Sequence, residues 1–149
     1  MLLPIHPTHP EPRKLRQAAD ALRAGGIISC PTDTVHAFAC SAHSASAISE
    51  LARLKHARPN KAGLSLICDD LSQLSLYARH VDTAAFRILK RALPGPYTFI
   101  LNASAETPKL FKNNRRTVGI RVPDQPIPRM LAAELGHALV VTSVHSDDE

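Results

Sequence analysis

The stretch from residue 25 to residue 36 constrains the fold most, because it combines a helix end, a strand and a loop. Gly25 and Gly26 predict the end of a helix, since glycine adopts the left-handed C-cap conformation without steric cost. Ile27 starts a buried strand, and Pro31 weakens its pairing because proline donates no hydrogen bond to a neighbouring strand. The side chains of residues 32–34 (Thr-Asp-Thr) are then expected to be free for a ligand. The alternative is an ordinary turn in which they cap their own backbone.

Helical and strand-like patterns alternate along the rest of the chain, which favours an α/β fold with helices packed on a sheet. Residues 97–102 and 117–122 are successive strand-like runs with no long helical pattern between them. Part of the sheet is therefore expected to be antiparallel, which makes the predicted sheet a mixed one. The other expected strands are residues 27–30, 64–68 and 139–142.

Caps and helix breakers indicate where the helices begin and end. In the helix that follows Asp82, the residues Phe86, Leu89 and Leu93 recur at helical spacing and are expected to face the core. The expected helices are residues 11–23, a helix that Ser44 caps and that ends before Pro59, a helix that Asp82 caps and that Pro94 stops, and a helix from Ile127 to Leu135 that Gly136 ends.

The length of 149 residues suits one domain with a sizeable core, and residues 1–149 are interpreted as that domain. The apolar runs are too short to span a membrane, and Pro4 stands where a secretory signal would be apolar, so a cytoplasmic protein is expected. The cysteines are odd in number and lack metal-ligand spacing. Cys30, Cys40 and Cys68 are therefore predicted to be reduced core thiols, and no metal site is expected.

The charge of the chain points to an anionic partner. A net charge of +5 and a pI near 9.4 favour binding to a nucleotide or to RNA phosphates. Basic residues gather in residues 53–61, 87–91 and 109–116. The group at 87–91 is interpreted as a solvated helix face. The group at 53–61 lies between a helix end and a strand and is interpreted as part of a binding site.

Several motifs, taken together and in this order, resemble the YrdC domain of the threonylcarbamoyl-AMP synthase superfamily. They cover nearly the whole chain, so the order is more specific than any single motif. Within the superfamily the chain most resembles the YciO branch, on the basis of Ile5-His6-Pro7, Cys40, and Leu74-Ser75 with Tyr77. The superfamily motifs are residues 22–34, Arg58-Pro59 with Lys61 before Leu64, residues 93–98, residues 118–123 and Val141-Thr142-Ser143.

The resemblance implies a twisted mixed sheet with a basic concave cavity. It also implies a reaction in which threonine, bicarbonate and ATP give threonylcarbamoyl-AMP and pyrophosphate, with Mg²⁺ travelling on the nucleotide. In this reading Arg121 holds the threonine carboxylate, although a surface ion pair is its alternative role. The implied site comprises the catalytic residues Lys55, Arg58 and Ser143, the substrate-binding residues Thr32, Thr34 and Arg121, and the phosphate-binding residues His56, Lys61, Thr98 and His145.

This chain departs from the family pattern at positions that matter for catalysis. His56 stands where active synthases have the lysine of a Lys-x-Arg pair, and Lys55 lies one residue earlier, about 100° away on a helix. His145 replaces the asparagine of a late Ser-x-Asn motif. Family members continue past this motif, so the C-terminal part of the domain is expected to be missing, in a naturally short protein or in a fragment. An incomplete sheet would favour a homodimer.

Two classes of function follow from these residues. The preferred hypothesis is a YciO-type protein that binds double-stranded RNA or tRNA, and nucleotide, in tRNA threonylcarbamoyladenosine (t6A) metabolism, with weak or absent synthase activity. The alternative is an active L-threonylcarbamoyladenylate synthase, or a hydrolase that acts on the threonylcarbamoyl group. RNA binding requires mainly positive charge, whereas catalysis requires the full set of positioned donors.

Overall fold

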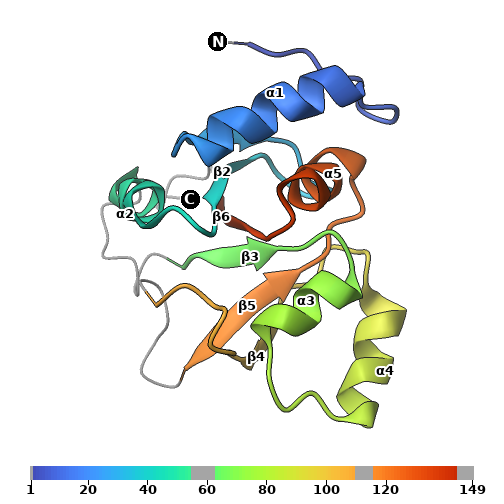
Figure 1. Ribbon diagram of the computed structural model, residues 1–149. Helices are drawn as coiled ribbons and strands as arrows, with labels where there is room; N and C mark the ends of the chain where they lie inside the picture. The colour runs from blue at the N-terminus through green and yellow to red at the C-terminus, as the bar shows by residue number, and fades with distance from the viewer. Residues whose placement is uncertain (1, 55–62, 110–115, 144–149) are drawn as a thin grey trace.

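The computed structural model describes residues 2–54, 63–109 and 116–143, and Figure 1 shows the order of the elements. In chain order they are α1 (Pro12–Arg23), β1 (Ile28–Cys30), β2 (Ala37–Ser41), α2 (Ala45–Leu54), β3 (Ser65–Ile67), α3 (Leu71–Tyr77), α4 (Thr83–Ala92), β4 (Phe99–Asn102), β5 (Thr117–Arg121), α5 (Pro126–Leu135) and β6 (Leu139–Ser143).

Within the described residues the strands form one six-stranded sheet in the order β1-β2-β6-β3-β5-β4. β3 and β5 are parallel, with Leu66 beside Ile120, and the other neighbouring strands are antiparallel. The mixed α/β fold predicted from the sequence is therefore confirmed. The two successive strand-like runs form the antiparallel pair β4 and β5.

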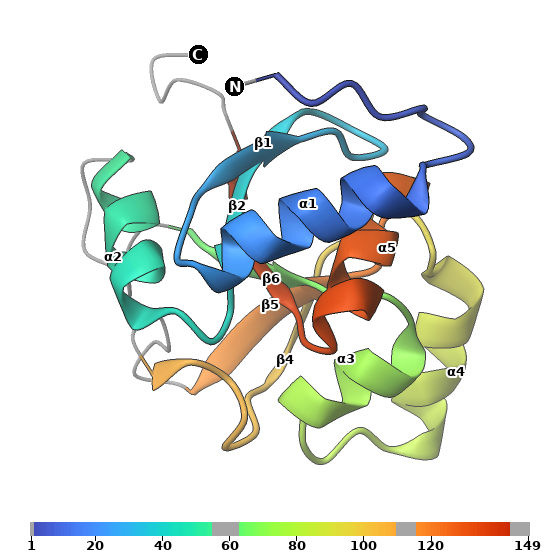
Figure 2. The same cartoon turned by 45° about the horizontal axis from the view of Figure 1, so that its top comes forward.

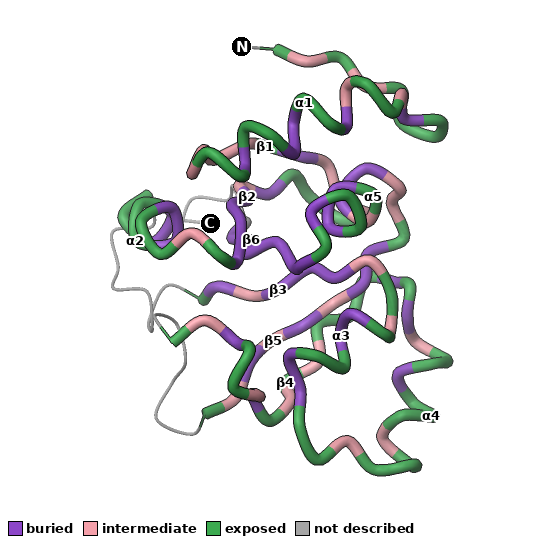
Figure 3. The backbone as a smooth tube through the Cα atoms, viewed as in Figure 1, coloured by how far each residue is buried: buried purple, intermediate pink, exposed green. Residues whose placement is uncertain are grey.

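The helices cover the two faces of the sheet unequally. α1 and α5 pack against each other and lie over one face, where they contact β2 and β3 (Figures 1 and 2). α2 and α3 lie on the other face, and α4 lies beside α3. Figure 3 shows that burial is concentrated in the central strands. Across the part of the chain that the structure describes, no helix has the length and apolar character needed to cross a membrane.

Alternate residues of the central strands supply two separate cores. Leu66 and Val140 belong to the core under α2 and α3, whereas Ile67 and Val141 belong to the core under α1 and α5. Successive side chains on a strand point to opposite faces of the sheet. Central strands covered on both faces are therefore continuously apolar, which explains why the run at residues 139–141 shows no alternation.

The predicted helix end at the two glycines is confirmed. Gly25 has a φ of 89°, a conformation that favours glycine. Gly26 donates its N–H to the carbonyl of Ala21 at 2.9 Å, and a Cβ on Gly26 would lie only 2.8 Å from that oxygen. The two residues together turn the chain from α1 into β1.

The predicted N-caps are confirmed as well. Ser44 Oγ accepts the N–H of Ala47 at 3.3 Å, and Asp82 Oδ1 accepts the N–H of Ala85 at 2.7 Å. At the C-terminal end of α5, Gly136 has a φ of 75°, as expected for a residue that ends a helix.

The cysteines behave as predicted. Cys30, Cys40 and Cys68 are free and buried. Burial raises the pKa of the Cys30 and Cys40 thiols to about 12. It also raises the pKa of Cys68, to which the nearby Asp69 and Asp70 carboxylates contribute. All three thiols stay protonated near neutral pH and act as small apolar core groups.

One orientation predicted from the sequence is wrong. Phe86 was expected to face the core, but 39% of it is exposed, and Lys90 Nζ lies 5.9 Å from the centre of its ring. Leu89 and Leu93 are buried as predicted. α4 lies at the periphery of the molecule and buries only a narrow apolar stripe. The helical spacing of apolar residues therefore predicted a wider buried face than α4 has.

Candidate functional site

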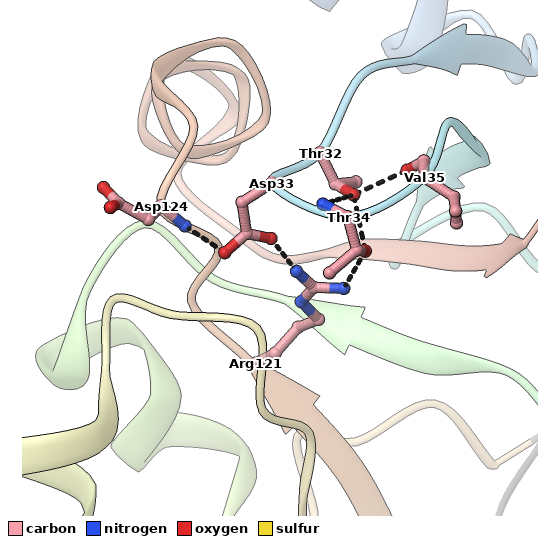
Figure 4. Close-up of polar contacts among 6 residues, drawn as sticks. All are labelled: Thr32, Asp33, Thr34, Val35, Arg121 and Asp124. Atoms are coloured by element: carbon pink, nitrogen blue, oxygen red, sulfur yellow. Dashed lines mark hydrogen bonds and ion pairs between the residues drawn. The ribbon is translucent and has the colours of Figure 1, made fainter.

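The loop between β1 and β2 contacts Arg121, at the end of β5, through the side chain of Asp33. The Arg121 guanidinium forms an ion pair with Asp33 Oδ1 and donates a second hydrogen bond, of 3.3 Å, to Thr34 Oγ1 (Figure 4). Asp33 Oδ2 accepts the backbone N–H of Asp124 at 2.9 Å. The strand order places β6 and β3 between β2 and β5, so this loop joins distant parts of the sheet.

Thr32 holds the shape of the same loop. Its Oγ1 donates to the carbonyl of Val35 at 2.6 Å and accepts the N–H of Thr34 at 3.1 Å. The hydroxyls of Thr32 and Thr34 are 3.1 Å apart. Thr32 therefore satisfies local backbone groups, which was the alternative that the sequence left open. The loop conformation depends on these bonds, and Thr34 presents its hydroxyl between Thr32 and Arg121.

The ion pair corrects the expectation that the Asp33 carboxylate is free, and it gives Arg121 a protein partner that differs from the surface ion pair considered as its alternative role. The side chains of Arg121 and Asp33 are only 12% and 11% exposed, so the pair is mostly buried rather than on the surface. Arg121 Nε is buried without a hydrogen-bond partner among the described residues. A buried donor without a partner is costly, and the Nε–H leaves the guanidinium able to donate one more hydrogen bond to an acceptor group.

An uncovered half of the sheet lies beside this loop. Leu66 pairs with Ile120, so Ser65 and Gly119 are neighbours, and Gly119 pairs with Ile100 on β4. Ile100 is 69% exposed, which is unusual for isoleucine in a sheet and shows that no described helix covers this area. The uncovered half is defined here by Ser65, Gly119, Ile100 and the adjacent Thr98.

Gly119 keeps the floor of the uncovered half flat. A Cβ at this position would lie 3.1 Å from Thr98 Cγ2 and 3.5 Å from Ser65 Cβ. Glycine in the interior of a strand often marks a place where a ligand or another chain approaches the backbone. No role was predicted for Gly119 from the sequence, although its position inside the strand pattern was a usable signal.

The predicted site residues divide into three groups. Thr32, Thr34 and Arg121 come together as predicted, and Thr98 is exposed just before β4. Ser143 ends β6 opposite Ala37, where the β1–β2 loop returns to the sheet. The others lie outside the described residues, namely Lys55, His56, Arg58, Lys61 and His145.

The described residues offer no metal centre, because no three His, Cys, Asp or Glu side chains among them gather closely enough to hold an ion. Arg53, the described member of the first basic group, is exposed and pairs with Glu50 at 3.3 Å. Sequence reasoning missed Asp124, whose backbone N–H fixes the Asp33 carboxylate. A backbone donor leaves no mark on residue type, so no sequence pattern indicates it.

The six-stranded sheet and the β1–β2 loop that contacts Arg121 define an open-sheet α/β protein, and the comparisons place it in a family. A profile of the Sua5/YciO/YrdC family, described as "Telomere recombination", matches residues 20–149. The chain is 40% identical over 141 residues to YciO of Escherichia coli (strain K12), covering 94% of this chain and 68% of that protein. A threonylcarbamoyl-AMP synthase of Halorhodospira halophila is 34% identical over 139 residues, covering 93% and 72%. The chain belongs to the Sua5/YciO/YrdC family.

Solved structures agree with this membership. The crystal structure of E. coli YciO matches with a TM-score of 0.84 and 40% identity, covering 93% of this chain and 66% of that chain. P. abyssi Sua5 complexed with L-threonine matches with a TM-score of 0.83 and 26% identity, covering 91% and 39%. The chain thus spans about two thirds of the length of YciO. The YrdC-like fold inferred from the motifs is confirmed.

Proposed function

We propose that this chain is a YciO-type protein of t6A metabolism that binds a threonine-like amino acid, nucleotide and double-stranded RNA or tRNA, with weak or no synthase activity. The observation that carries the small-molecule part is the contact of Arg121 with Asp33 and Thr34, beside an uncovered half of the sheet. Family membership and the likeness to a Sua5 structure complexed with L-threonine support it.

The paired charges suit an amino-acid zwitterion. A free amino acid carries a carboxylate and an ammonium on adjacent atoms, and Arg121 and Asp33 present the complementary groups side by side. In the proposed complex the carboxylate of the amino acid accepts hydrogen bonds from the Arg121 guanidinium, which has one N–H without a partner. The ammonium of the amino acid pairs with the Asp33 carboxylate. Thr34 Oγ1 is within reach as a partner for a substrate hydroxyl.

The nucleotide is proposed to lie on the uncovered half, with ATP bringing Mg²⁺ on its phosphates. Gly119 would let an aromatic base or a sugar approach the sheet, and exposed Ile100 would supply apolar contact. Thr98 is the described phosphate-binding candidate on this surface. The other proposed roles rest on the sequence, and they are those of Lys55, His56, Arg58, Lys61, Ser143 and His145.

Weak turnover is proposed because histidines replace the lysine and the asparagine of the catalytic pattern. The histidine side chain at positions 56 and 145 is not a permanent cation like a lysine ammonium, and it differs in shape from an amide. The alternative, an active synthase, draws support from the 34% identity to a threonylcarbamoyl-AMP synthase. A hydrolase acting on the threonylcarbamoyl group would use the same residues.

Calorimetric titration of L-threonine into the purified chain tests the small-molecule part. We expect saturable binding in the wild type and a loss of roughly tenfold or more in Arg121→Lys, because lysine keeps the charge but cannot make the bidentate contact. Arg87→Lys is the matched control on exposed α4 and should bind like the wild type. Equal affinity of wild type and Arg121→Lys for threonine would refute the site.

Titration of duplex RNA and tRNA at several salt concentrations tests the RNA part. Phosphate contacts release counterions, so the logarithm of the affinity should fall linearly with the logarithm of the salt concentration. If the chain binds threonine but neither duplex RNA nor tRNA, even at low salt, its function is limited to the small-molecule part of the proposal.

A further inference from the structure

A second, strongly basic pocket lies at the far end of the β4–β5 hairpin from Arg121. It has a volume of about 370 Å³ and is lined by Arg79, Ala103, Ser104, Ala105, Lys109 and Arg116. Half of the lining residues that the structure describes carry a positive charge, and none of these described residues is acidic. Neither the small-molecule site nor the predicted RNA group at residues 53–61 includes any of these residues.

Backbone hydrogen bonds tie together the segments that carry the cations. The N–H of Ala103 donates to the carbonyl of Arg116 at 2.8 Å, which extends the pairing of β4 and β5 by one residue. The N–H of Arg79 donates to the carbonyl of Asn102 at 2.9 Å. Ser104, another residue that lines the pocket, is held in place because its N–H donates to the carbonyl of Tyr77 at 2.9 Å. The backbone segments that carry Arg79 and Arg116 are thus held together by the fold.

The cations of this pocket lack protein partners within the described residues. Arg79, Lys109 and Arg116 are exposed, and none forms an ion pair there. By contrast, exposed Arg23 and Arg53 each pair with an acid one turn away. Gathering like charges without a counter-charge is unfavourable, and a bound polyanion would offset that cost.

The pocket faces away from the uncovered half of the sheet. Alternate residues of β5 point to opposite faces, and Val118 belongs to the core on the α3 side whereas Gly119 lies in the uncovered half. Ala103, which lines the pocket, is buried in the same core as Val118. A ligand in this pocket would leave the Arg121 site accessible.

We propose that this pocket, formed by Arg79, Lys109 and Arg116, binds the phosphate groups of an RNA backbone. Guanidinium groups match phosphate oxygens bidentately, and an open pocket with exposed cations suits a passing phosphodiester strand better than an enclosed small anion. The inference deepens the proposed RNA binding by assigning it a surface on the face opposite the small-molecule site. The same chemistry would accept free polyphosphate, so the test includes both ligands.

The test compares two variants that lose the same charge. The pocket variant is Arg79→Gln/Lys109→Gln/Arg116→Asn, with asparagine at 116 because Arg116 has a φ of 53° and asparagine tolerates that region. The matched control is Arg87→Gln/Lys90→Gln/Arg91→Asn on α4. Binding of a duplex RNA, inorganic tripolyphosphate and L-threonine is measured for each variant over a range of salt concentrations, after circular dichroism has shown that both are folded.

We expect the pocket variant to lose at least about tenfold in RNA affinity at low salt, with a log–log salt slope smaller by about 0.9 for each phosphate contact removed. The control should lose much less, and threonine binding should be unchanged in both. Equal losses in the two variants would overturn the pocket while leaving RNA binding itself intact. Pocket-dependent binding of tripolyphosphate without RNA binding would overturn the RNA assignment. No binding of either ligand by the wild type would overturn the pocket together with the RNA part of the proposed function.

Discussion

Arg121 and Asp33 form a mostly buried ion pair that joins β5 to the loop between β1 and β2. Asp33 is held in turn by the N–H of Asp124, which follows β5 in the chain. The ion pair therefore attaches the β1–β2 loop to the end of β5. The same two side chains belong to the candidate site. Stability and binding are coupled here, so a change in either residue affects both.

The first prediction concerns the energy of this pair. Arg121→Ala should lower the free energy of unfolding by about 3–5 kcal/mol, because Asp33 is left as a buried carboxylate without its counter-charge. Arg121→Ala/Asp33→Ala should be more stable than the sum of the single changes implies. Urea unfolding of the four proteins gives the coupling energy. Strict additivity would show that the two side chains do not interact in solution.

The second prediction concerns Gly119. Gly119→Val should reduce nucleotide affinity tenfold or more, because its side chain would fill the floor beside Thr98, where even a Cβ lies 3.1 Å from Cγ2. The melting temperature should change little, since exposed Thr98 can shift. Ala84→Leu adds the same number of carbon atoms to the exposed surface of α4 and serves as the control. Unchanged ATP binding in Gly119→Val would place the nucleotide elsewhere.

Local signals in the sequence were sufficient for much of the fold. Gly25, Ser44 and Asp82 ended or began helices where the structure has them, because caps and positive φ are local requirements. β2 and α3 were not predicted. β2 carries the small residues Ala37 and Ala39, which give little strand signal and are ordered by pairing with β1 and β6 on either side. Tertiary pairing, rather than propensity, makes this strand.

Among the described residues of the candidate site, the sequence predicted which side chains meet better than it predicted the bonds between them. The convergence of Thr34 and Arg121 followed from the motifs, but the partner of Arg121 did not. Asp33 is remote in sequence from Arg121, and the choice between a free carboxylate and an ion pair depends on how the loop crosses the sheet. The basic pocket was missed for the same reason, since Arg79 lies far from Lys109 in the chain.

The third prediction concerns acid stability. His137 is buried, donates to or accepts from Ser41 Oγ at 2.7 Å, and stacks on His43 with ring centres 3.7 Å apart. Burial, together with the His43 and Arg23 charges, lowers the pKa of His137 to about 4. In the unfolded chain this histidine has a pKa near 6.5, so the unfolded chain binds more protons than the folded one as the pH falls from about 6.5 to 4. The contribution of His137 to the free energy of unfolding should decline through this window.

Urea unfolding from pH 7.5 to pH 4 measures that decline. His137→Gln keeps a polar group for Ser41 but does not titrate, so its stability should depend less on pH between 6.5 and 4. His9→Gln removes an exposed histidine in the N-terminal segment and should retain the wild-type pH dependence. Identical profiles for wild type and His137→Gln would assign the acid sensitivity to other groups.

The last prediction is that the chain makes little threonylcarbamoyl-AMP. Pyrophosphate release that requires both threonine and bicarbonate is measured beside the Halorhodospira halophila synthase, to which the chain is 34% identical. Loss of one preorganised electrostatic group commonly costs about 10²–10³ in rate, and this chain has His56 and His145 in place of two such groups. We expect at least a hundredfold lower rate, with partial recovery in His56→Lys/His145→Asn. Wild-type turnover near that of the synthase would favour the active-enzyme alternative, with Lys55 as the substitute cation.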